Sequence, residues 1–432
     1  MKRGIESAIV LGAGLSGRAA EALLQSEDVD VVVVDERTHD GDAVERLCRE
    51  RLFELGVVSP GFSLQHPWLV ALREAGVAYC SELELGWSRY AGRTVAVTGS
   101  NGKSSTVKWL ADGLKKCGFE VGLGGNYGVP ASTLARTHSR ADWWVLEVSS
   151  FQLETVVDFT PEVGVLLNVR PNHLDRHGDM ETYVRTKERI FGSKGNALKR
   201  AVLPWEWRDL YAATLDGVED VAWVGTEKEA DYRAQEGRVW CGERLVLDVR
   251  GSYFDAPHWM ASSAVAVAAV MEAVGVGREA FEEAAQQFEG LAHRFERVEC
   301  VNGVEFINDS KATNLAAMAA AVASCRGGVR LLAGGVLKES DLSFVKEILA
   351  EKVLRLYVFG NAASIMEREW GREMACASFG SMKDAFDEAC REAFEGEVVL
   401  LSPGCASFDQ FKSFEERGDR FKTLVSRWSE GR

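Results

Sequence analysis

The sequence predicts an α/β protein in which mostly parallel sheets are covered by helices. The first observation is a repeated unit, in which a short β-branched run ends at a glycine or polar residue and a helical stretch follows. The second is the length of 432 residues, which exceeds what one hydrophobic core usually serves, so several domains are expected. The third is a composition of 46% hydrophobic and 27% charged residues, which is typical of a soluble globular chain.

The predicted strands are spread along the whole chain. They occupy residues 8–11, 31–34, 94–97, 143–146, 163–167, 331–332 and 398–401. In parallel α/β sheets, ligands bind at the carboxyl ends of the strands. Because the unusual polar residues of this chain follow these runs, we expect the functional sites at those ends.

Charge and cysteine content argue against several classes of protein. The formal net charge of −15 argues against nucleic acid as the main partner, although a local loop of amides can still hold a small phosphate. The nine cysteines form no CxxC pair, which argues against a disulfide framework or a thiolate zinc site and is typical of the reducing cytoplasm. No apolar run approaches the length of a membrane span, so neither membrane insertion nor a signal peptide is expected.

A phosphate-binding loop is predicted at residues 98–104, which read TGSNGKS between a strand and a helical run. Backbone amides of such a turn converge on phosphate oxygens, the lysine adds charge and the serine hydroxyl reaches Mg²⁺. Val97 occupies a position where the general P-loop pattern has glycine, so the match is to a shortened GxxGKS form. The alternative is a glycine turn with an exposed lysine. We predict an ATP site whose contacts are Gly99, Ser100, Asn101, Gly102, Lys103, Ser104 and Ser105.

A second glycine loop, GAGLSG at residues 12–17, also follows a strand and opens a helix. Asp35 ends the next strand, which completes the spacing of a dinucleotide-binding fingerprint whose acid contacts a ribose. The pattern requires only a phosphate-bearing ligand or its ribose, so a UDP-sugar suits it as well as NAD does. The phosphate loop favours the UDP-sugar, because a dehydrogenase has no use for that loop. The alternative is tight strand–helix packing without a ligand.

Glu147 and His173 are the metal-ligand candidates. Glu147 follows the strand at 143–146, where a carboxylate beside a P-loop can hold Mg²⁺ against the phosphates. His173 lies in NHLDR at 172–176, after the next strand. Lys187 lies on a charged helical stretch, and an isolated lysine in that setting is usually solvated.

Three polar stretches gather in the last third of the chain. They are HRFE at 293–296, NDSKATN at 308–314 and SPGCASFDQF at 402–411. Lysines, hydroxyls and amides grouped in this way can bind a small dicarboxylate or close on phosphates. Each stretch by itself could instead cap a loop.

Together these residues resemble the muramyl (Mur) ligase family over essentially the whole chain. NDSKATN and SPGCASFDQF are similar to stretches of the members that add D-glutamate, whereas TGSNGKS and LEVSSFQLE at 146–154 are shared more widely. The resemblance implies an ATP-dependent amide ligase that joins D-glutamate to UDP-N-acetylmuramoyl-L-alanine in peptidoglycan precursor synthesis. It implies a Rossmann-like UDP-binding domain at 1–90, a central P-loop ATPase domain at 91–292, and a Rossmann-like domain at 293–432 that binds D-glutamate and closes on ATP. We expect a cytoplasmic monomer with a hinge near residues 290–293.

The resemblance also implies roles for single residues. Lys187 would be carbamylated and would hold a second Mg²⁺ with His173, while Glu147 and Ser104 serve the first. The catalytic set would then be Lys103, Glu147, His173 and Lys187. Contacts to the UDP-substrate would fall on Leu15, Ser16, Asp35, Arg37, Gly61, Asn126, Ser149 and Gln152. Contacts to D-glutamate would fall on Thr313, Lys338, Ser407 and Phe414, and contacts to ATP also on His293, Arg294, Asp309 and Lys311.

One departure from the family pattern concerns ATP. The family usually has HNxxN before the long helix of the central domain, whereas residues 258–262 read HWMAS, with Trp259 and Ser262 at the asparagine positions. Trp259 could stack on adenine, or ATP binding is weaker. Three rival interpretations stay open: a sibling muramyl ligase with another amino acid, a folylpolyglutamate synthetase, and a non-catalytic nucleotide-binding homologue. We predict an active ligase, because the departure leaves the phosphate loop and the metal-ligand candidates intact.

Overall fold

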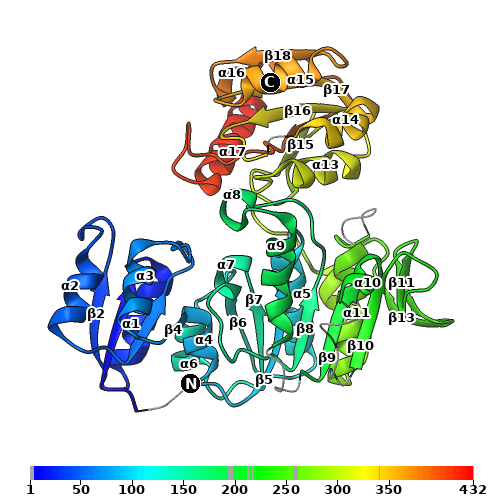
Figure 1. Cartoon of the computed structure of the whole chain (residues 1–432). Coiled ribbons are helices and arrows are strands. Elements are labelled where there is room, and N and C mark those ends of the chain that lie inside the picture. The colour runs from blue at the N-terminus through cyan, green and yellow to red at the C-terminus, as the bar shows by residue number, and fades with distance from the viewer. Residues whose placement is uncertain are drawn as a thin grey trace. The chain divides into compact units, whose positions relative to one another are not determined.

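Figure 1 shows the computed structural model of the chain, which describes residues 4–192, 198–211, 215, 218, 220–255, 261–339 and 341–431. Two compact units are present. Unit 1 comprises Met1–Val169 and Arg176–Phe288, and unit 2 comprises Arg170–Asp175 and Glu289–Arg432. Unit 1 contains two sheets and unit 2 contains one.

The first sheet of unit 1 is parallel, with the strand order β2-β1-β3-β4. Its strands are β1 (Ser7–Leu11), β2 (Asp30–Val34), β3 (Leu55–Val58) and β4 (Tyr79–Ser81). Helices α1 (Leu15–Gln25) and α4 (Glu82–Trp87) pack on one face, and α2 (Ala43–Glu50) and α3 (Pro67–Glu74) pack on the other. Alternate residues of β1 are buried in both helix layers, as expected for a central parallel strand.

The second sheet of unit 1 has nine strands in the described part of the chain, in the order β13-β12-β11-β10-β9-β8-β5-β7-β6. They are β5 (Arg93–Thr98), β6 (Val121–Gly125), β7 (Trp143–Glu147), β8 (Val163–Leu166), β9 (Arg200–Pro204), β10 (Asp220–Gly225), β11 (Tyr232–Gln235), β12 (Arg238–Cys241) and β13 (Arg244–Asp248). The sheet is parallel from β6 to β11, and β12 and β13 pair antiparallel at one edge. Because β5 lies between β7 and β8, the phosphate loop leaves the sheet beside the carboxyl ends of both neighbours.

Eight α-helices are described between β5 and the end of α12, and the first of them, α5, starts at the phosphate loop. They are α5 (Lys103–Lys116), α6 (Ala131–Thr137), α7 (Ser150–Leu153), α8 (Leu174–His177), α9 (Met180–Glu188), α10 (Arg208–Tyr211), α11 (Ala261–Val274) and α12 (Glu279–Gln286). Trp109 of α5 donates from Nε1 to the Phe281 carbonyl of α12 at 2.8 Å. A Cβ on Gly113 would lie 2.4 Å from the Phe281 ring, so α5 and α12 approach closely because this position is glycine.

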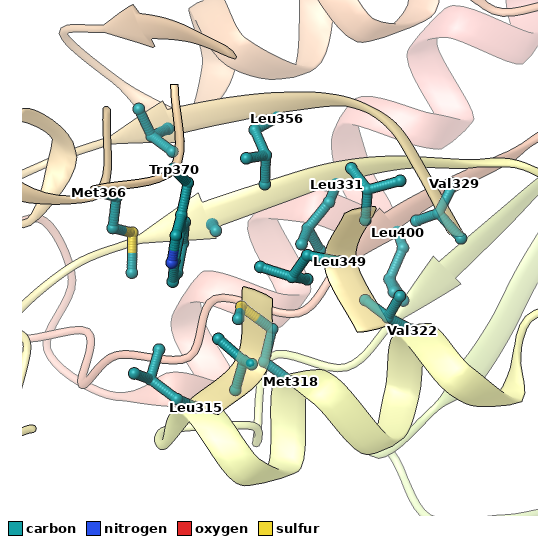
Figure 2. Packing of buried hydrophobic residues seen from close by; sticks show 14 of the residues in the cluster. Leu315, Met318, Val322, Val329, Leu331, Leu349, Leu356, Met366, Trp370 and Leu400 are labelled. Atoms are coloured by element: carbon teal, nitrogen blue, oxygen red, sulfur yellow. The ribbon is translucent and has the colours of Figure 1, made fainter. Parts of the chain in front are cut away.

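Unit 2 is built on a six-stranded sheet in the order β14-β15-β19-β16-β17-β18, parallel except for the β14–β15 pair. Its strands are β14 (Glu296–Val301), β15 (Val304–Asn308), β16 (Val329–Gly334), β17 (Val353–Phe359), β18 (Cys376–Phe379) and β19 (Val398–Leu401). Helices α13 (Leu315–Ser324), α14 (Lys346–Lys352) and α15 (Ala363–Trp370) cover one face, and α16 (Met382–Glu392) and α17 (Phe414–Glu430) cover the other. Figure 2 shows the first of these two cores, where Trp370 packs with residues of α13 and α15 over the sheet.

The predicted α/β class with mostly parallel sheets is confirmed. Every predicted strand is present, and the run at 331–332 is the middle of the longer β16. The exact domain boundaries at 90 and 292 stay a prediction, and Trp259 lies outside the described residues. All nine cysteines are free thiols. Among the helices that the structure describes, none combines the length and apolarity needed to cross a bilayer.

Candidate active site

The phosphate loop has a backbone conformation that requires glycine at two positions. Gly99 has a φ of +152° and Gly102 a φ of +86°, where side chains are strained. Asn168, which follows β8, holds the loop from the neighbouring strand. Its carbonyl accepts from the Ser100 amide at 3.0 Å, its Oδ1 accepts from the Asn101 amide at 2.9 Å, and its Nδ2 donates to the Asn101 carbonyl at 3.1 Å. The sequence interpretation missed Asn168, because an asparagine after a strand is also an ordinary loop residue.

The residues predicted to contact phosphate lie at the start of α5. Lys103 is the first residue of the helix, and its Nζ donates to the carbonyls of Gly99 at 2.7 Å and Ser100 at 3.0 Å. Ser104 and Ser105 are buried in the first helical turn. The N-terminus of a helix carries partial positive charge and exposed amides, so this end of α5 suits the phosphates of ATP.

Glu147 is the last residue of β7, and its side chain is only 2% exposed. The sheet register pairs Glu147 with Val97, directly before the phosphate loop. Asn126 donates from Nδ2 to Glu147 Oε1 at 2.6 Å, and the Asn126 amide donates to the Glu147 carbonyl at 2.9 Å. The structure thus brings together a residue predicted to bind metal and one predicted to bind the UDP-substrate.

Lys187 is buried, so its interpretation as a solvated lysine is wrong. The side chain lies on α9 with 1% exposure, and its Nζ lies 3.4 Å from Thr98 Oγ1 and 4.6 Å from the centre of the Tyr183 ring. Burial lowers the pKa of Lys187 well below its usual range, the nearby Lys103 lowers it further, and Glu147 partly offsets both. A neutral amine is the form that reacts with CO₂, so these surroundings fit a carbamate.

Oxygen donors suited to Mg²⁺ surround this part of the sheet. The buried Glu147 carboxylate and the Ser104 hydroxyl are hard ligands of the kind that Mg²⁺ prefers. Within the described residues, no three His, Cys, Asp or Glu side chains converge on one metal position. His173 has a left-handed φ of +56° and belongs to the 170–175 segment of unit 2. Its pairing with Glu147 or Lys187 stays a prediction.

The glycine loop at 12–17 packs β1 tightly against α1. A Cβ on Gly17 would lie 1.7 Å from the Gly12 carbonyl oxygen, so this position requires glycine. Asp35 accepts from the Ala13 amide at 2.8 Å and from Arg37 Nε at 2.7 Å. These contacts hold the pKa of Asp35 well below its usual range, with Arg37 as the main cause. Leu15, the first residue of α1, is 81% exposed, and Ser16 follows it in the helix.

Two further residues predicted to contact the UDP-substrate have a local role as well. Ser149 is the N-cap of α7 and accepts from the Gln152 amide at 3.2 Å. Gln152 Oε1 accepts in return from the Ser149 amide at 3.0 Å, which completes a capping box. The pair therefore fixes the turn that leaves β7 directly after Glu147.

In unit 2, Asp309 joins the three predicted polar stretches. Its Oδ1 accepts from the Phe295 amide at 3.0 Å, and its Oδ2 accepts from Ser402 Oγ at 2.8 Å. Burial raises the pKa of Asp309 to about 7, and the bond from Ser402 partly offsets this effect. The stretches at 293–296, 308–314 and 402–411 thus form one cluster at the strand ends of this sheet.

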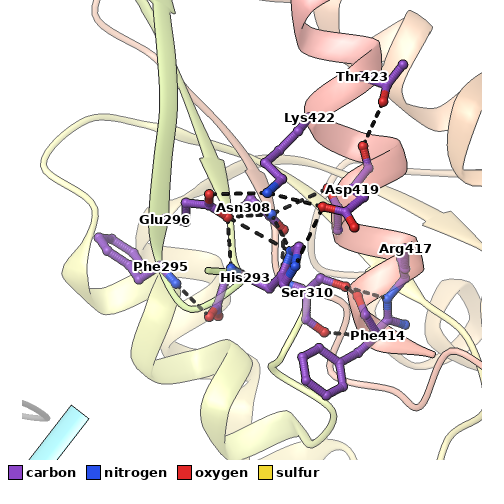
Figure 3. Close-up of polar contacts among 12 residues, drawn as sticks. His293, Phe295, Glu296, Asn308, Ser310, Phe414, Arg417, Asp419, Lys422 and Thr423 are labelled. Carbon is purple, nitrogen blue, oxygen red and sulfur yellow. Dashed lines mark hydrogen bonds and ion pairs between the residues drawn. The ribbon is translucent and has the colours of Figure 1, made fainter. Parts of the chain in front are cut away.

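His293 lies on the same cluster, which Figure 3 shows. It has a φ of +63°, its Nδ1 lies 3.0 Å from Asn308 Nδ2, and its amide donates to Glu296 Oε2 at 2.8 Å. Its carbonyl accepts from the Lys311 amide at 2.9 Å. Burial is the main cause that lowers the pKa of His293. Four residues of this cluster were predicted to contact ATP, namely His293, Arg294, Asp309 and Lys311.

Arg417 is a buried cation that the sequence interpretation missed. It donates from Nε to Ser310 Oγ at 3.0 Å, from Nη2 to the Ser310 carbonyl at 2.8 Å and from Nη1 to the Cys405 carbonyl at 3.0 Å. It therefore ties the stretch at 308–314 to the stretch at 402–411. Figure 3 shows the Arg417 and Ser310 side of this connection. An arginine on an amphipathic helix such as α17 is usually solvated, so the sequence pattern carries no signal for this role.

The loops that carry the predicted D-glutamate contacts are paired with one another. Val336 and Ala406 exchange backbone hydrogen bonds of 2.8 and 3.0 Å, which brings the loop of Lys338 beside that of Ser407. The Phe414 carbonyl accepts from Ser310 Oγ at 2.8 Å. Thr313 directly precedes Asn314, the N-cap of α13. Lys338 and Ser407 thus lie on paired loops of unit 2, whereas Phe414 is the first residue of α17.

Comparison with known proteins gives a family for this arrangement. The Mur ligase middle domain matches residues 97–245, and the Mur ligase, glutamate ligase domain matches residues 293–405. A protein of Koribacter versatilis (strain Ellin345) named UDP-N-acetylmuramoylalanine--D-glutamate ligase is 34% identical, over 98% of this chain and 97% of its own. The chain belongs to the Mur ligase family.

Solved structures share the fold of this Mur ligase. The UDP-N-acetylmuramate-alanine ligase MurC of Thermotoga maritima has a TM-score of 0.63 at 16% identity, over 99% of this chain and 100% of its own. The MurF ligase of Thermotoga maritima in complex with ADP has a TM-score of 0.60 at 19% identity, over 99% of this chain and 96% of its own. At these identities the likeness concerns the fold of this Mur ligase and leaves its substrates open.

Proposed function

We propose that this Mur ligase joins D-glutamate to UDP-N-acetylmuramoyl-L-alanine through an amide bond and converts ATP to ADP and phosphate. The observation that carries the proposal is the phosphate loop after β5, with the buried Glu147 and Lys187 on the flanking elements. The full-length relative from Koribacter versatilis, named for this reaction, supports the amino acid. The MurF ligase in complex with ADP supports the nucleotide.

The proposed chemistry begins with phosphoryl transfer. The loop amides and Lys103 would hold the β- and γ-phosphates of ATP, while the alanine carboxylate of the UDP-substrate attacks the γ-phosphate. The acyl phosphate formed in this step would be attacked by the D-glutamate amine, and the tetrahedral intermediate would expel phosphate. Positioning and charge neutralisation supply most of the acceleration in phosphoryl transfer.

Lys103 would change partners during this reaction. Its Nζ now donates to the carbonyls of Gly99 and Ser100, so bound phosphate oxygens would have to replace those acceptors. The carbonyls are neutral, whereas phosphate oxygens carry charge and form stronger hydrogen bonds with an ammonium group. The exchange therefore favours the phosphate-bound position of the lysine.

Glu147, Ser104 and Lys187 would hold the Mg²⁺ ions, together with His173. When bound, two Mg²⁺ ions would neutralise the negative charge that phosphoryl transfer brings together. The buried Lys187, whose pKa is lowered by burial, would react with CO₂ and become an oxygen ligand as its carbamate. Its burial also protects the modified group from bulk water.

The proposed site for the acceptor amino acid lies in unit 2. We propose that Thr313, Lys338, Ser407 and Phe414 bind D-glutamate. Asp309 and Arg417 support this proposal, because they tie the stretch at 308–314, which carries Thr313, to the stretch at 402–411, which carries Ser407. The rival enzymes share the fold, so the fold alone does not separate them: a folylpolyglutamate synthase/dihydrofolate synthase with Mn, AMPPNP and L-Glutamate bound has a TM-score of 0.58. The stretches NDSKATN and SPGCASFDQF favour D-glutamate.

Phosphate release tests the proposal directly. The protein is assayed with ATP, Mg²⁺ and UDP-N-acetylmuramoyl-L-alanine, and D-glutamate is compared with L-glutamate, L-alanine and no amino acid. We expect release that requires D-glutamate. Release with another amino acid would assign a sibling activity. Binding of ATP without release under any condition would support the non-catalytic alternative.

A further inference from the structure

Arg176 of α8 donates hydrogen bonds to three consecutive carbonyls of a loop about 115 residues earlier in the chain. Its Nη1 donates to Pro60 O at 2.7 Å and to Gly61 O at 3.2 Å, and its Nη2 donates to Phe62 O at 2.7 Å. The side chain of Arg176 is only 12% exposed. A guanidinium that spans three successive carbonyls restricts the curvature of the backbone between them, because its five N–H groups have a fixed planar geometry.

The same guanidinium also contacts two residues that follow β7, Glu154 and Phe151. It forms a bidentate pair with Glu154, with Nε 3.0 Å from Oε1 and Nη2 2.5 Å from Oε2. The Glu154 side chain is 7% exposed, so the carboxylate of this pair is buried. Arg176 Cζ also lies 4.1 Å from the centre of the Phe151 ring in α7. His177 Nδ1 lies 3.5 Å from Glu154 Oε1 and adds a second contact to this carboxylate.

The loop that Arg176 holds packs on the glycine loop proposed to bind the UDP-substrate. A Cβ on Gly12 would lie 2.9 Å from Ser59 Oγ and 3.0 Å from the Phe62 ring. The loop is closed by a hydrogen bond from the Phe62 amide to the Ser59 carbonyl at 3.2 Å. Between these two contact residues lies Gly61, itself proposed to contact the UDP-substrate.

We propose that Arg176 is a positioning residue for the UDP-substrate, which it serves by fixing the backbone of residues 60–62. This inference rests on the proposed function. Arg176 acts through the loop, since all of its loop contacts are to backbone carbonyls. It is also the first residue of unit 1 after the 170–175 segment that carries His173. The same side chain therefore anchors the chain where the proposed metal-ligand segment ends.

Removal of Arg176 alone would leave the Glu154 carboxylate buried without its partner, and a buried, uncompensated charge can prevent folding. The test therefore uses the double variant Arg176→Met with Glu154→Gln, and Arg176→Lys beside it. The matched control is Arg89→Met with Glu27→Gln. Arg89 has a 6% exposed side chain and is also paired with its glutamate through Nε and Nη2, at 3.1 and 3.0 Å. The Arg89 guanidinium donates to Glu27 and to Ser88 Oγ.

We expect the double variant at Arg176 to raise KM for the UDP-substrate at least about ten-fold, which corresponds to ~1.4 kcal/mol of binding. KM for ATP and for D-glutamate should change less than about two-fold, because those sites keep their contacts. Hydrogen exchange of the amides at 59–62 should become faster. Arg176→Lys should give an intermediate KM, because one ammonium cannot reach all three carbonyls in a fixed plane.

An unchanged KM for the UDP-substrate would overturn the inference, as would equal losses in all three KM values or an equal effect in the Arg89 control. Calorimetric titration with UDP alone separates this question from the proposed function. If the wild-type protein binds UDP but releases no phosphate, the proposed reaction fails, and weaker UDP binding in the Arg176 variant would still support the positioning role. Equal UDP binding in wild type and variant would refute it.

Discussion

Glu82 offers a thermodynamic test of the structure that is independent of catalysis. It is the first residue of α4, its side chain is 2% exposed, and its Oε1 accepts from the Ser132 amide in α6 at 2.6 Å. Burial raises the pKa of Glu82 to about 7 from an ordinary value of 4.5, and the Ser132 amide partly offsets this rise. The contact joins α4, which packs on the four-stranded sheet, to α6. We predict that Glu82→Gln stabilises the protein at alkaline pH relative to acidic pH.

The sign follows from proton linkage. A carboxyl group whose pKa is higher in the folded state binds its proton more tightly there than in the unfolded chain. The stabilisation that comes from this tighter proton binding is therefore fully present below pH 4.5. It declines as the pH rises and is lost above about pH 7. At ~1.4 kcal/mol for each pH unit between the two pKa values, the loss is about 3 kcal/mol as an upper limit.

Differential scanning calorimetry of wild type and Glu82→Gln at pH 5 and pH 8 measures this effect. Glutamine keeps an oxygen that accepts from Ser132 and removes the charge. Any fixed cost of the amide group is the same at both pH values and cancels in the comparison. We expect the Tm difference between variant and wild type to be about 5 °C more favourable at pH 8 than at pH 5. Glu74→Gln, at an exposed position of α3, serves as control and should show no such dependence. The same Tm difference at both pH values would refute the burial argument.

Three other outcomes are expected. Lys103→Ala should lower D-glutamate-dependent phosphate release about 100- to 1,000-fold, because a charged donor to the phosphates is lost. The control Lys108→Ala, on the same helix and paired with Asp112, should retain near-normal release. Lys187→Ala should lower kcat at least about 100-fold if the carbamate is a ligand. The control Lys199→Ala, at an exposed lysine, should stay close to wild type in the same assay. Normal turnover of Lys187→Ala would remove this lysine from the mechanism. Trp370→Ala should lower the free energy of unfolding of unit 2 by about 3–5 kcal/mol. The reason is that the side chain is fully buried and donates to the Leu342 carbonyl at 3.1 Å. A change below about 1 kcal/mol in chemical denaturation would contradict the packing in Figure 2.

Local patterns in the sequence carried most of the fold. The glycines at 99 and 102 and the β-branched run before them define the phosphate loop, because glycine is needed wherever φ is positive. The spacing of Gly12 and Gly17 predicted a ligand-binding glycine loop between a strand and a helix, and the structure shows why Gly17 is needed there, because a Cβ would meet the Gly12 carbonyl. Both features depend on a few adjacent residues, so they can be predicted from the sequence without the tertiary structure.

The polar stretches of unit 2 were recognisable as a group, but their connection was not. The structure places Asp309 between the Phe295 amide and the Ser402 hydroxyl, whose residues lie far apart in sequence. No residue pattern in a single chain states which of several polar side chains will face one another. That depends on the order of strands in the sheet, where β19 is inserted between β15 and β16.

The sequence alone therefore determined the α/β class, the phosphate loop and the group of candidate residues, since each follows from local backbone preference or from side-chain type. Tertiary structure alone decided which charged side chains leave water. Lys187, Arg176 and Arg417 occupy ordinary helical positions, yet Lys187 and Arg417 are buried and Arg176 is only 12% exposed, because elements distant in the chain cover them. The free energy of a charged group depends on the partners and the water that surround it. Those surroundings exist only after the elements have packed.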